Sequence, residues 1–325
     1  MNTSTAPSRI WPHRLAVLTA TVAFGLLFLG GLVTSHSAGL SVPDWPTSYG
    51  WNMFTFPMKN WTGGIFYEHT HRLLASFVGF LILVQAFVLH RYEPRPLVRR
   101  LGWLALAGVI VQGTLGGLTV LFYLPPAISS SHAGLGQAVF CLTLTIALMT
   151  NRRWNDARPK RVEPIRFGLR DLSLATAITI FCQLLVGAVM RHTDSGLAIP
   201  TFPFAPNGSL IPDFTSFHVA IHFAHRVGAV IVTLMVFWTA RTAMKYYLRD
   251  KAIAYLMLLA MFLLGLQIML GAITIWTAKA VTPATLHVSC GAALLGTMVL
   301  VMVLTRHRYV AAGRVPTSAS VAPAH

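Results

Sequence analysis

Long apolar stretches alternate with short polar segments along the whole chain. A helix that crosses a membrane needs about 20 mainly apolar residues, and the pattern predicts an all-α membrane protein with eight transmembrane helices. The predicted spans are residues 15–34, 67–89, 101–121, 130–150, 171–190, 218–240, 253–275 and 282–304. Arg9 and Arg14 precede the first span, as in a signal peptide, but no small-residue cleavage site follows it. We therefore interpret it as a retained helix.

The composition excludes several other classes of protein. Hydrophobic residues make up 55% of the chain and charged residues only 10%, whereas about a quarter of the residues in a soluble protein are charged. Such a chain has too little polar surface to be a cytosolic enzyme, a disordered protein or a soluble nucleic-acid binder. The three cysteines all lie in apolar runs and form no C-x-x-C pair.

The positive charge is concentrated on one side of the predicted membrane protein. Most of the 25 lysines and arginines lie in the N-terminal tail, in residues 91–100, 151–170 and 241–251, and in the C-terminal tail. Eight spans place all of these segments on the same side, which the positive-inside rule identifies as cytoplasmic. We therefore predict that both termini are cytoplasmic, and we interpret the net charge of +16 as a topology signal beside membrane lipid, not as a nucleic-acid site.

The two halves of the sequence resemble each other at a shift of about 155 residues. His71-Arg72 recurs as His225-Arg226, and His132 recurs as His287. The segment 112–119 recurs as 267–274. Each begins with a glutamine, has a glycine four residues later and ends with a threonine. Because each repeat has four helices, an even number, both copies enter the membrane from the same side. The repeat predicts two tandem four-helix bundles related by a pseudo-two-fold axis along the membrane normal.

These patterns divide the chain into four parts. The N-terminal four-helix repeat occupies residues 1–150 and the C-terminal repeat residues 171–305, with a basic cytoplasmic linker at 151–170 and a cytoplasmic tail at 306–325. The two outer loops, 35–66 and 191–217, are rich in glycine, proline and aromatic residues. We expect them to form a structured cap at the level of the lipid headgroups.

Four repeat-related histidines carry the candidate chemistry. His71, His132, His225 and His287 lie near the starts of helices two, four, six and eight, all of which enter from the outer side. Polar groups inside a membrane are costly and usually functional. Two imidazoles from facing helices are typical of a haem iron held on both faces, whereas zinc needs three or four ligands. The alternative is that each histidine only forms hydrogen bonds between helices. The other outer-side histidines are interpreted as interface groups: His36, His69, His192, His218 and, less firmly, His222.

Glu68 distinguishes the first repeat from the second. It lies one helical turn before His71, and the matching residue before His225 is His222. A carboxylate beside a cofactor could transfer protons or stabilise positive charge, or it could be a solvated residue at a helix N-terminus. Arg72 and Arg226 suit either haem propionates or lipid phosphates. The two repeated glutamines are interpreted as helix-packing residues.

Several of these motifs together resemble the haem A synthase family. The resemblance spans residues 15–305 and rests on short segments: Ala38 to Pro46, Phe66 to Arg72, Ser131-His132-Ala133-Gly134, His225-Arg226 and Leu286-His287. It implies an oxidoreductase in the bacterial plasma membrane that oxidises the C8 methyl group of haem O to the formyl group of haem A. It also implies haem O synthase and cytochrome oxidase assembly as partners, with the electron donor left open.

The resemblance also assigns the site residues. By family analogy, His71 and His132 bind the substrate haem O, His225 and His287 bind a haem b that carries electrons, and Glu68 is the essential glutamate. Some members carry a cysteine pair in the outer loops, but these loops contain no cysteine. The chain therefore resembles the cysteine-free branch, to which a mechanism through such a thiol pair cannot apply.

Two other functions are compatible with parts of this pattern. A dihaem b-type electron-transfer cytochrome would share the four histidines but would need no acid beside one pair. A transporter built from repeats would place its site at the membrane midplane, whereas the paired histidines lie near one face and the helices show no interruption at the midplane.

Overall fold

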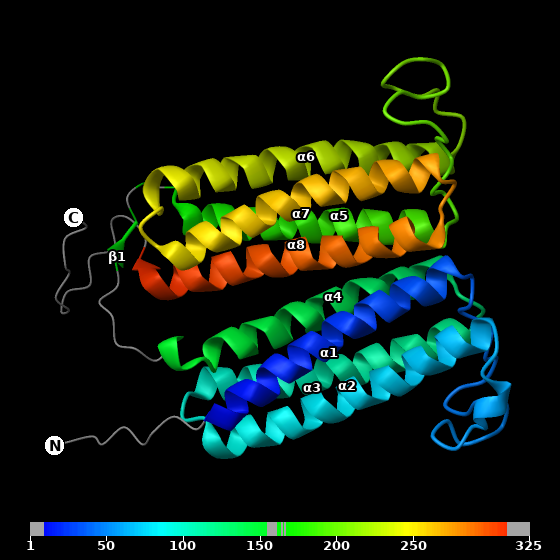
Figure 1. The fold of residues 1–325 in the computed structure, drawn as a ribbon, viewed down its shortest axis with the longest axis horizontal. Helices are drawn as coiled ribbons and strands as arrows, with labels where there is room; N and C mark the ends of the chain where they lie inside the picture. Colours follow the sequence, from blue (N-terminus) through cyan, green and yellow to red (C-terminus); the bar gives the residue numbers. More distant parts are fainter. Residues whose placement is uncertain (1–9, 155–160, 164, 166, 311–325) are drawn as a thin grey trace.

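Eight long helices dominate the structure, a computed structural model that describes residues 10–154, 161–163, 165 and 167–310. All eight are long and apolar enough to cross a membrane, so the predicted all-α class with eight spans is confirmed. They are α1 (Ile10–Ser35), α2 (Gly64–Tyr92), α3 (Pro96–Leu121), α4 (Pro126–Met149), α5 (Leu169–His192), α6 (Phe217–Tyr246), α7 (Lys251–Trp276) and α8 (Val281–Arg308) (Figure 1).

The helices extend beyond the apolar windows from which they were predicted. The apolar pattern of the sixth span ends at residue 240, whereas α6 continues to Tyr246, because a helix can carry polar residues once it leaves the hydrocarbon. Local signals set several of the starts. Pro96 and Pro126 occupy the first turns of α3 and α4, where proline is tolerated. Ser216 caps α6 by accepting a hydrogen bond from the Val219 N–H.

The helices contact one another in two groups of four. Helices α1 to α4 contact each other in a ring, α5 to α8 form a second ring, and the two groups meet through α1 and α4 on one side and α5 and α8 on the other. Small residues allow this close approach. A methyl group on Gly31 of α1 would lie 3.1 Å from Thr285 of α8, and one on Gly296 of α8 would lie 2.7 Å from Leu144 of α4. The pseudo-two-fold axis stays a prediction.

Both long connections lie at one end of the molecule, and the start of α1 and the end of α8 lie at the other (Figure 1). One connection joins α1 to α2 and contains the short 3-10 helix η1 (Met58–Asn60), and the other joins α5 to α6. We call them the first and second outer loops. The short turns after α3 and α7 share a backbone feature. Two consecutive residues have positive φ angles in each turn, Tyr123 and Leu124 in the first and Ala278 and Lys279 in the second.

At the opposite end, a small parallel pairing joins the connection between α4 and α5 to the end of α8. It consists of β1 (Arg161–Val162) and β2 (Tyr309–Val310), and the 3-10 helix η2 (Arg152–Trp154) precedes it. The buried Glu163 accepts a hydrogen bond from the Tyr247 hydroxyl. Burial raises the pKa of this carboxyl, although the bond to Tyr247 acts in the opposite direction. Residues 1–9, residues 155–160, 164 and 166 of the predicted linker, and the tail beyond residue 310 lie outside the described residues.

Candidate functional site

The fold brings the four histidines together as two pairs. His225 of α6 faces His287 of α8, with ring centroids 6.3 Å apart and planes at 65°. His71 of α2 and His132 of α4 lie within electrostatic range of each other. Each lies about two turns from the outer end of its helix. All four imidazoles are half-buried among the helices.

Two of the imidazoles are oriented by backbone carbonyls. The Nδ1 of His132 lies 3.1 Å from the Gln112 carbonyl oxygen, and the Nδ1 of His287 lies 3.1 Å from the Gln267 carbonyl oxygen. A proton on Nδ1 that is donated to a carbonyl makes Nε2 the nitrogen that carries the lone pair, which is the usual arrangement of a metal-bound histidine. The separation of His225 from His287 also fits one iron between them, because two metal–nitrogen bonds of about 2 Å place the ring centroids about 6 Å apart.

The repeated glutamines contribute more than helix packing. The Gln112 side-chain amide donates to the backbone carbonyl of His132 (2.9 Å), and the Nε2 atoms of the two residues are 3.4 Å apart. In the second half, the Nε2 atoms of Gln267 and His287 are 3.3 Å apart. The sequence pattern predicts only helix packing for these glutamines. Their constant spacing of 20 residues before each histidine, present in both halves, was the signal that could have connected them to the site.

Each imidazole also lies against a glycine of a neighbouring helix. A methyl group on Gly30 of α1 would lie 3.3 Å from His71, and one on Gly187 of α5 would lie 3.0 Å from His225. A methyl group on Gly116 of α3 would lie 3.0 Å from His132, and one on Gly271 of α7 would lie 3.1 Å from His287. The four glycines thus leave room for the rings at equivalent places in the repeat.

The two pairs differ in how firmly the first histidine of each is held. The Gln183 amide lies 3.0 Å from His225 Nδ1 and donates to the His225 backbone carbonyl at 2.8 Å. Leu26 is the corresponding residue on α1. Within the described part of the chain, the His71 ring forms no hydrogen bond that matches the one at His225. Side-chain amides therefore contact both histidines of the second pair but only one of the first.

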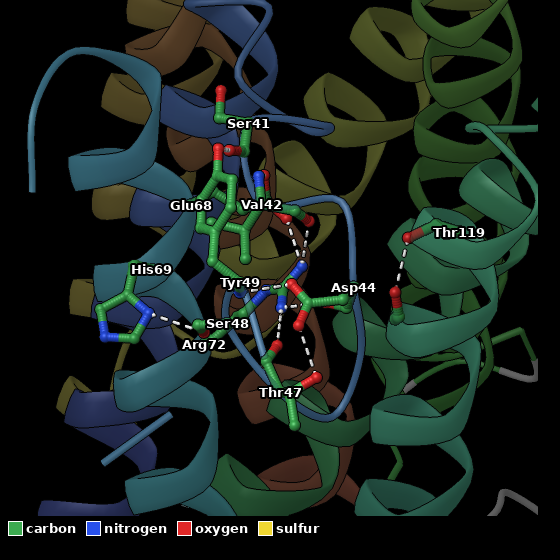
Figure 2. Close-up of polar contacts among 11 residues, drawn as sticks. Ser41, Val42, Asp44, Thr47, Ser48, Tyr49, Glu68, His69, Arg72 and Thr119 are labelled. Atoms are coloured by element: carbon green, nitrogen blue, oxygen red, sulfur yellow. Dashed lines mark hydrogen bonds and ion pairs between the residues drawn. The ribbon is translucent and has the colours of Figure 1, made fainter. Parts of the chain in front are cut away.

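Glu68 and Arg72 hold the first outer loop against α2. The Val42 N–H donates to Glu68 Oε2 (2.8 Å), while Arg72 Nη2 donates to Glu68 Oε1 (2.6 Å) and to the Val42 carbonyl (2.7 Å). Arg72 Nη1 donates to the carbonyls of Asp44 and Thr47. Figure 2 shows these groups converging where the loop passes α2. The carboxylate of Glu68 is buried.

The second outer loop is held in the same way, with an imidazole in place of the carboxylate. The Ile199 N–H donates to His222 Nδ1 (3.2 Å), and Arg226 Nη2 donates to the Ile199 carbonyl (3.1 Å). Arg226 also donates to the carbonyls of Thr201 and Pro203. Both arginines thus donate to loop carbonyls, whereas the sequence predicts haem propionates or lipid phosphates as their partners. The asymmetry between Glu68 and His222 persists within one shared arrangement.

The first outer loop covers the pair formed by His71 and His132. Asp44 fixes a turn in this loop. Its carboxylate accepts hydrogen bonds from Thr47 Oγ1 and from the N–H groups of Tyr49 and Gly50. Burial opposes ionisation of Asp44, but these hydrogen bonds outweigh it and hold its pKa below the ordinary value of 3.8. The neighbouring Trp45 ring packs on Gly117 of α3, beside the glycine that contacts His132.

Two of the remaining outer-side histidines, His36 and His69, pack against aromatic side chains. His69 is fully buried, not at the interface as expected, because it lies between Phe56 and Trp61 and its Nδ1 is 3.2 Å from Ser48 Oγ (Figure 2). His36 stacks on Tyr67 with ring centroids 3.8 Å apart. The sequence could not show that the loop folds back over His69.

The donor atoms fit haem better than a small metal ion. Among the described residues, no group of three or more histidines, cysteines or acidic residues is arranged to hold a metal ion. The three cysteines are free thiols on helices α4, α5 and α8. Paired imidazoles, glycines beside the rings and apolar helices around them suit a flat apolar macrocycle with one iron.

Comparisons with known proteins agree with this geometry. A family model described as cytochrome oxidase assembly protein (COX15-CtaA) matches residues 13–299. The chain is 26% identical to a heme A synthase of Lysinibacillus sphaericus over 298 residues, 90% of this chain and 95% of the relative. It is 28% identical to that of Bacillus pumilus, over 85% of this chain and 90% of the relative. It is 31% identical to that of Symbiobacterium thermophilum, over 69% of this chain and 73% of the relative.

Proposed function

The chain belongs to the cytochrome oxidase assembly protein family, as its motifs predicted, and from this we propose that it is a haem A synthase. It oxidises the C8 methyl group of haem O to the formyl group of haem A. The observation that carries this proposal is the repeated pair of imidazoles at one depth, within a family whose curated relatives are heme A synthases. A haem b would serve as cofactor.

The two pairs take different haems. His71 and His132 bind the substrate haem O, and His225 and His287 bind haem b, which when bound would carry electrons. The difference in hydrogen bonding supports this division. Side chains of Gln183 and Gln267 contact both imidazoles of the second pair, which restricts the orientation of both rings and suits a permanently bound cofactor. The His71 ring has no matching amide, which suits a haem that must enter and leave.

Glu68 places a fixed negative charge beside the substrate pair. It lies one turn from His71, and its two oxygens accept hydrogen bonds from Arg72 and from the Val42 N–H. A charge held in this way stabilises positive charge that develops during oxidation, and it needs no reorganisation at that moment. His222 fills the same place in the second half, so the carboxylate is specific to the half that carries out the chemistry.

Arg72 and Arg226 act on the haem sites through the outer loops. Each donates to three loop carbonyls. In this way they hold a covering segment over each pair of histidines and limit the access of water. Exclusion of water strengthens the electrostatic interactions within a site.

The membrane orientation follows from the distribution of positive charge. The enzyme is a multi-pass protein of the bacterial plasma membrane, with both termini cytoplasmic and both haem sites near the outer surface. Haem O synthase supplies its substrate, and its product is used in cytochrome oxidase assembly.

Replacement of Glu68 tests the catalytic role. In cells that lack the native enzyme, Glu68→Gln should lower haem A formation about a hundredfold or more, because the fixed charge is lost. Glu93→Gln is the matched control, since Glu93 pairs with Arg95 at the opposite end of α2, and it should form haem A normally. Haem A at the normal rate in Glu68→Gln would contradict the catalytic role.

Haem extraction tests the function itself. Protein purified from cells that supply haem O should yield haem A or its hydroxylated precursor together with haem b. If only haem b is recovered, the chain is instead a dihaem b-type electron-transfer cytochrome.

A further inference from the structure

Arg191 lies at the outer end of α5, where the two groups of helices meet. It is half-buried and reaches from the second half of the chain to the first, where its Nη2 donates to the Gly31 carbonyl (2.9 Å) and to Ser35 Oγ (2.7 Å) on α1. Ser35 Oγ is in turn 2.9 Å from Thr285 Oγ1 on α8. This guanidinium therefore has fixed neutral partners at the junction of α1, α5 and α8.

Within the described part of the chain, no carboxylate balances the charge of Arg191. The outer side holds four of the chain's nine acidic residues, and each has another role or location. Asp44 fixes the turn in the first outer loop, Glu68 pairs with Arg72, Asp194 pairs with Lys279 (2.6 Å), and Asp213 is exposed on the second outer loop. A guanidinium in an apolar environment without a counter-charge is costly, so the arrangement calls for an anion from outside the chain.

The position of Arg191 identifies where this anion would lie. Its charge is within electrostatic range of His287, a member of the second pair. The next residue, His192, is within range of both Arg191 and His132. Arg72 and Arg226, in contrast, donate to the carbonyls of the outer loops. Of these three outer-side arginines, Arg191 is therefore the one whose donors are not used by an outer loop among the described residues.

We propose that Arg191 binds a propionate carboxylate of the haem held by His225 and His287. This inference rests on the proposed haem binding. A carboxylate is the anion that a guanidinium recognises best, through charge-assisted hydrogen bonds, and propionates are the anionic groups of haem. Both N–H groups of Nη2 are used on α1, so Nη1 and Nε are the donors left for the carboxylate. Because Nη2 is already anchored on α1, the bound propionate links the second haem site to the first half of the chain.

The test compares the binding of haem b and of its dimethyl ester, in which the propionate charges are removed. His71→Ala protein in detergent, which keeps only the second pair, should bind haem b more tightly than the ester. Adding Arg191→Gln should reduce this preference about tenfold to a hundredfold, because a hydrogen-bonded charge pair is lost. Arg191→Lys should retain part of the preference. Lys279→Gln, which removes another outer-side cation, should leave it unchanged.

The ratio of the two affinities separates a specific contact from damage to the fold. If Arg191→Gln weakens the binding of both haems equally, the preference survives and the proposal is wrong. It is also wrong if the preference changes only in His225→Ala protein, in which the first pair alone remains. Failure of the proposed haem binding has a different signature, since the protein would then bind neither haem b nor its ester. Failure of the synthase activity alone would appear in the haem extraction, as haem b without haem A.

Discussion

At the scale of single residues, the absence of a side chain is as important to the site as the ligands themselves. Each of the four imidazoles lies beside a glycine on the preceding helix, at distances where an added methyl group would force the ring to move. A metal-bound imidazole tolerates little displacement, because its bond length and the hydrogen bond at Nδ1 are both fixed. Glycine at these four positions is therefore a requirement of the site and not only of helix packing.

Alanine at Gly116 should disturb the first pair of histidines. Its methyl group would lie 3.0 Å from His132 Cε1, so the ring must shift by a few tenths of an ångström and haem occupancy of this pair should fall about tenfold. Gly113→Ala on the same helix is the control, because nothing lies within 4 Å of its added methyl group. Absorption spectra of the purified variants measure occupancy. Equal occupancy in both variants would show that the ring tolerates the contact.

At the scale of elements, the outer loops are held mainly by side chains of the helices that follow them. In both loops, an arginine one residue after a candidate ligand binds three backbone carbonyls, and an acceptor three residues before that ligand binds a loop N–H. The planar fork of arginine suits several carbonyls at once, whereas the ammonium group of lysine is a single point charge. The ligand, its loop anchor and its loop acceptor thus lie on one helical segment.

Arg226→Lys should loosen the second outer loop without removing charge. We expect the Ile199 N–H and its neighbours to exchange hydrogen about tenfold to a hundredfold faster, since at least one charge-assisted hydrogen bond is lost. Arg241→Lys, at the other end of α6, should leave exchange in this loop unchanged. Hydrogen-exchange mass spectrometry provides the measurement. Unchanged protection in Arg226→Lys would show that other contacts hold the loop.

At the scale of the whole molecule, the two halves meet through small residues on α1 and α8 and through polar groups near the outer surface. Gly31, Gly296 and Thr285 allow α1, α4 and α8 to approach closely. Lipid tails are as apolar as leucine, so this contact depends on packing and on a few hydrogen bonds, and not on the hydrophobic effect between helices. The contact between halves is therefore sensitive to an increase in side-chain volume.

Gly296→Val should weaken the contact between α4 and α8. Its Cβ would lie 2.7 Å from Leu144 and 3.2 Å from Phe140, and overpacking of this kind typically costs about 1–3 kcal/mol. We expect a lower apparent unfolding temperature in detergent. Gly25→Val on α1 provides the comparison, because its Cβ meets nothing within 4 Å. If both variants unfold at the same temperature, the junction has room to adjust.

The sequence by itself determined the eight spans, because the hydrocarbon core demands a run of apolar residues that can be counted directly. It also identified the four histidines, since polar groups repeated at one depth are conspicuous in an apolar chain. Only the tertiary structure showed that Gln112 and Gln267 orient two of the rings, that Glu68 and Arg72 hold a loop, and that His69 is buried beneath it. It also showed that Arg191 has no acidic partner among the described residues. These properties depend on which segments meet in space, and hydropathy and spacing along one chain do not encode such contacts.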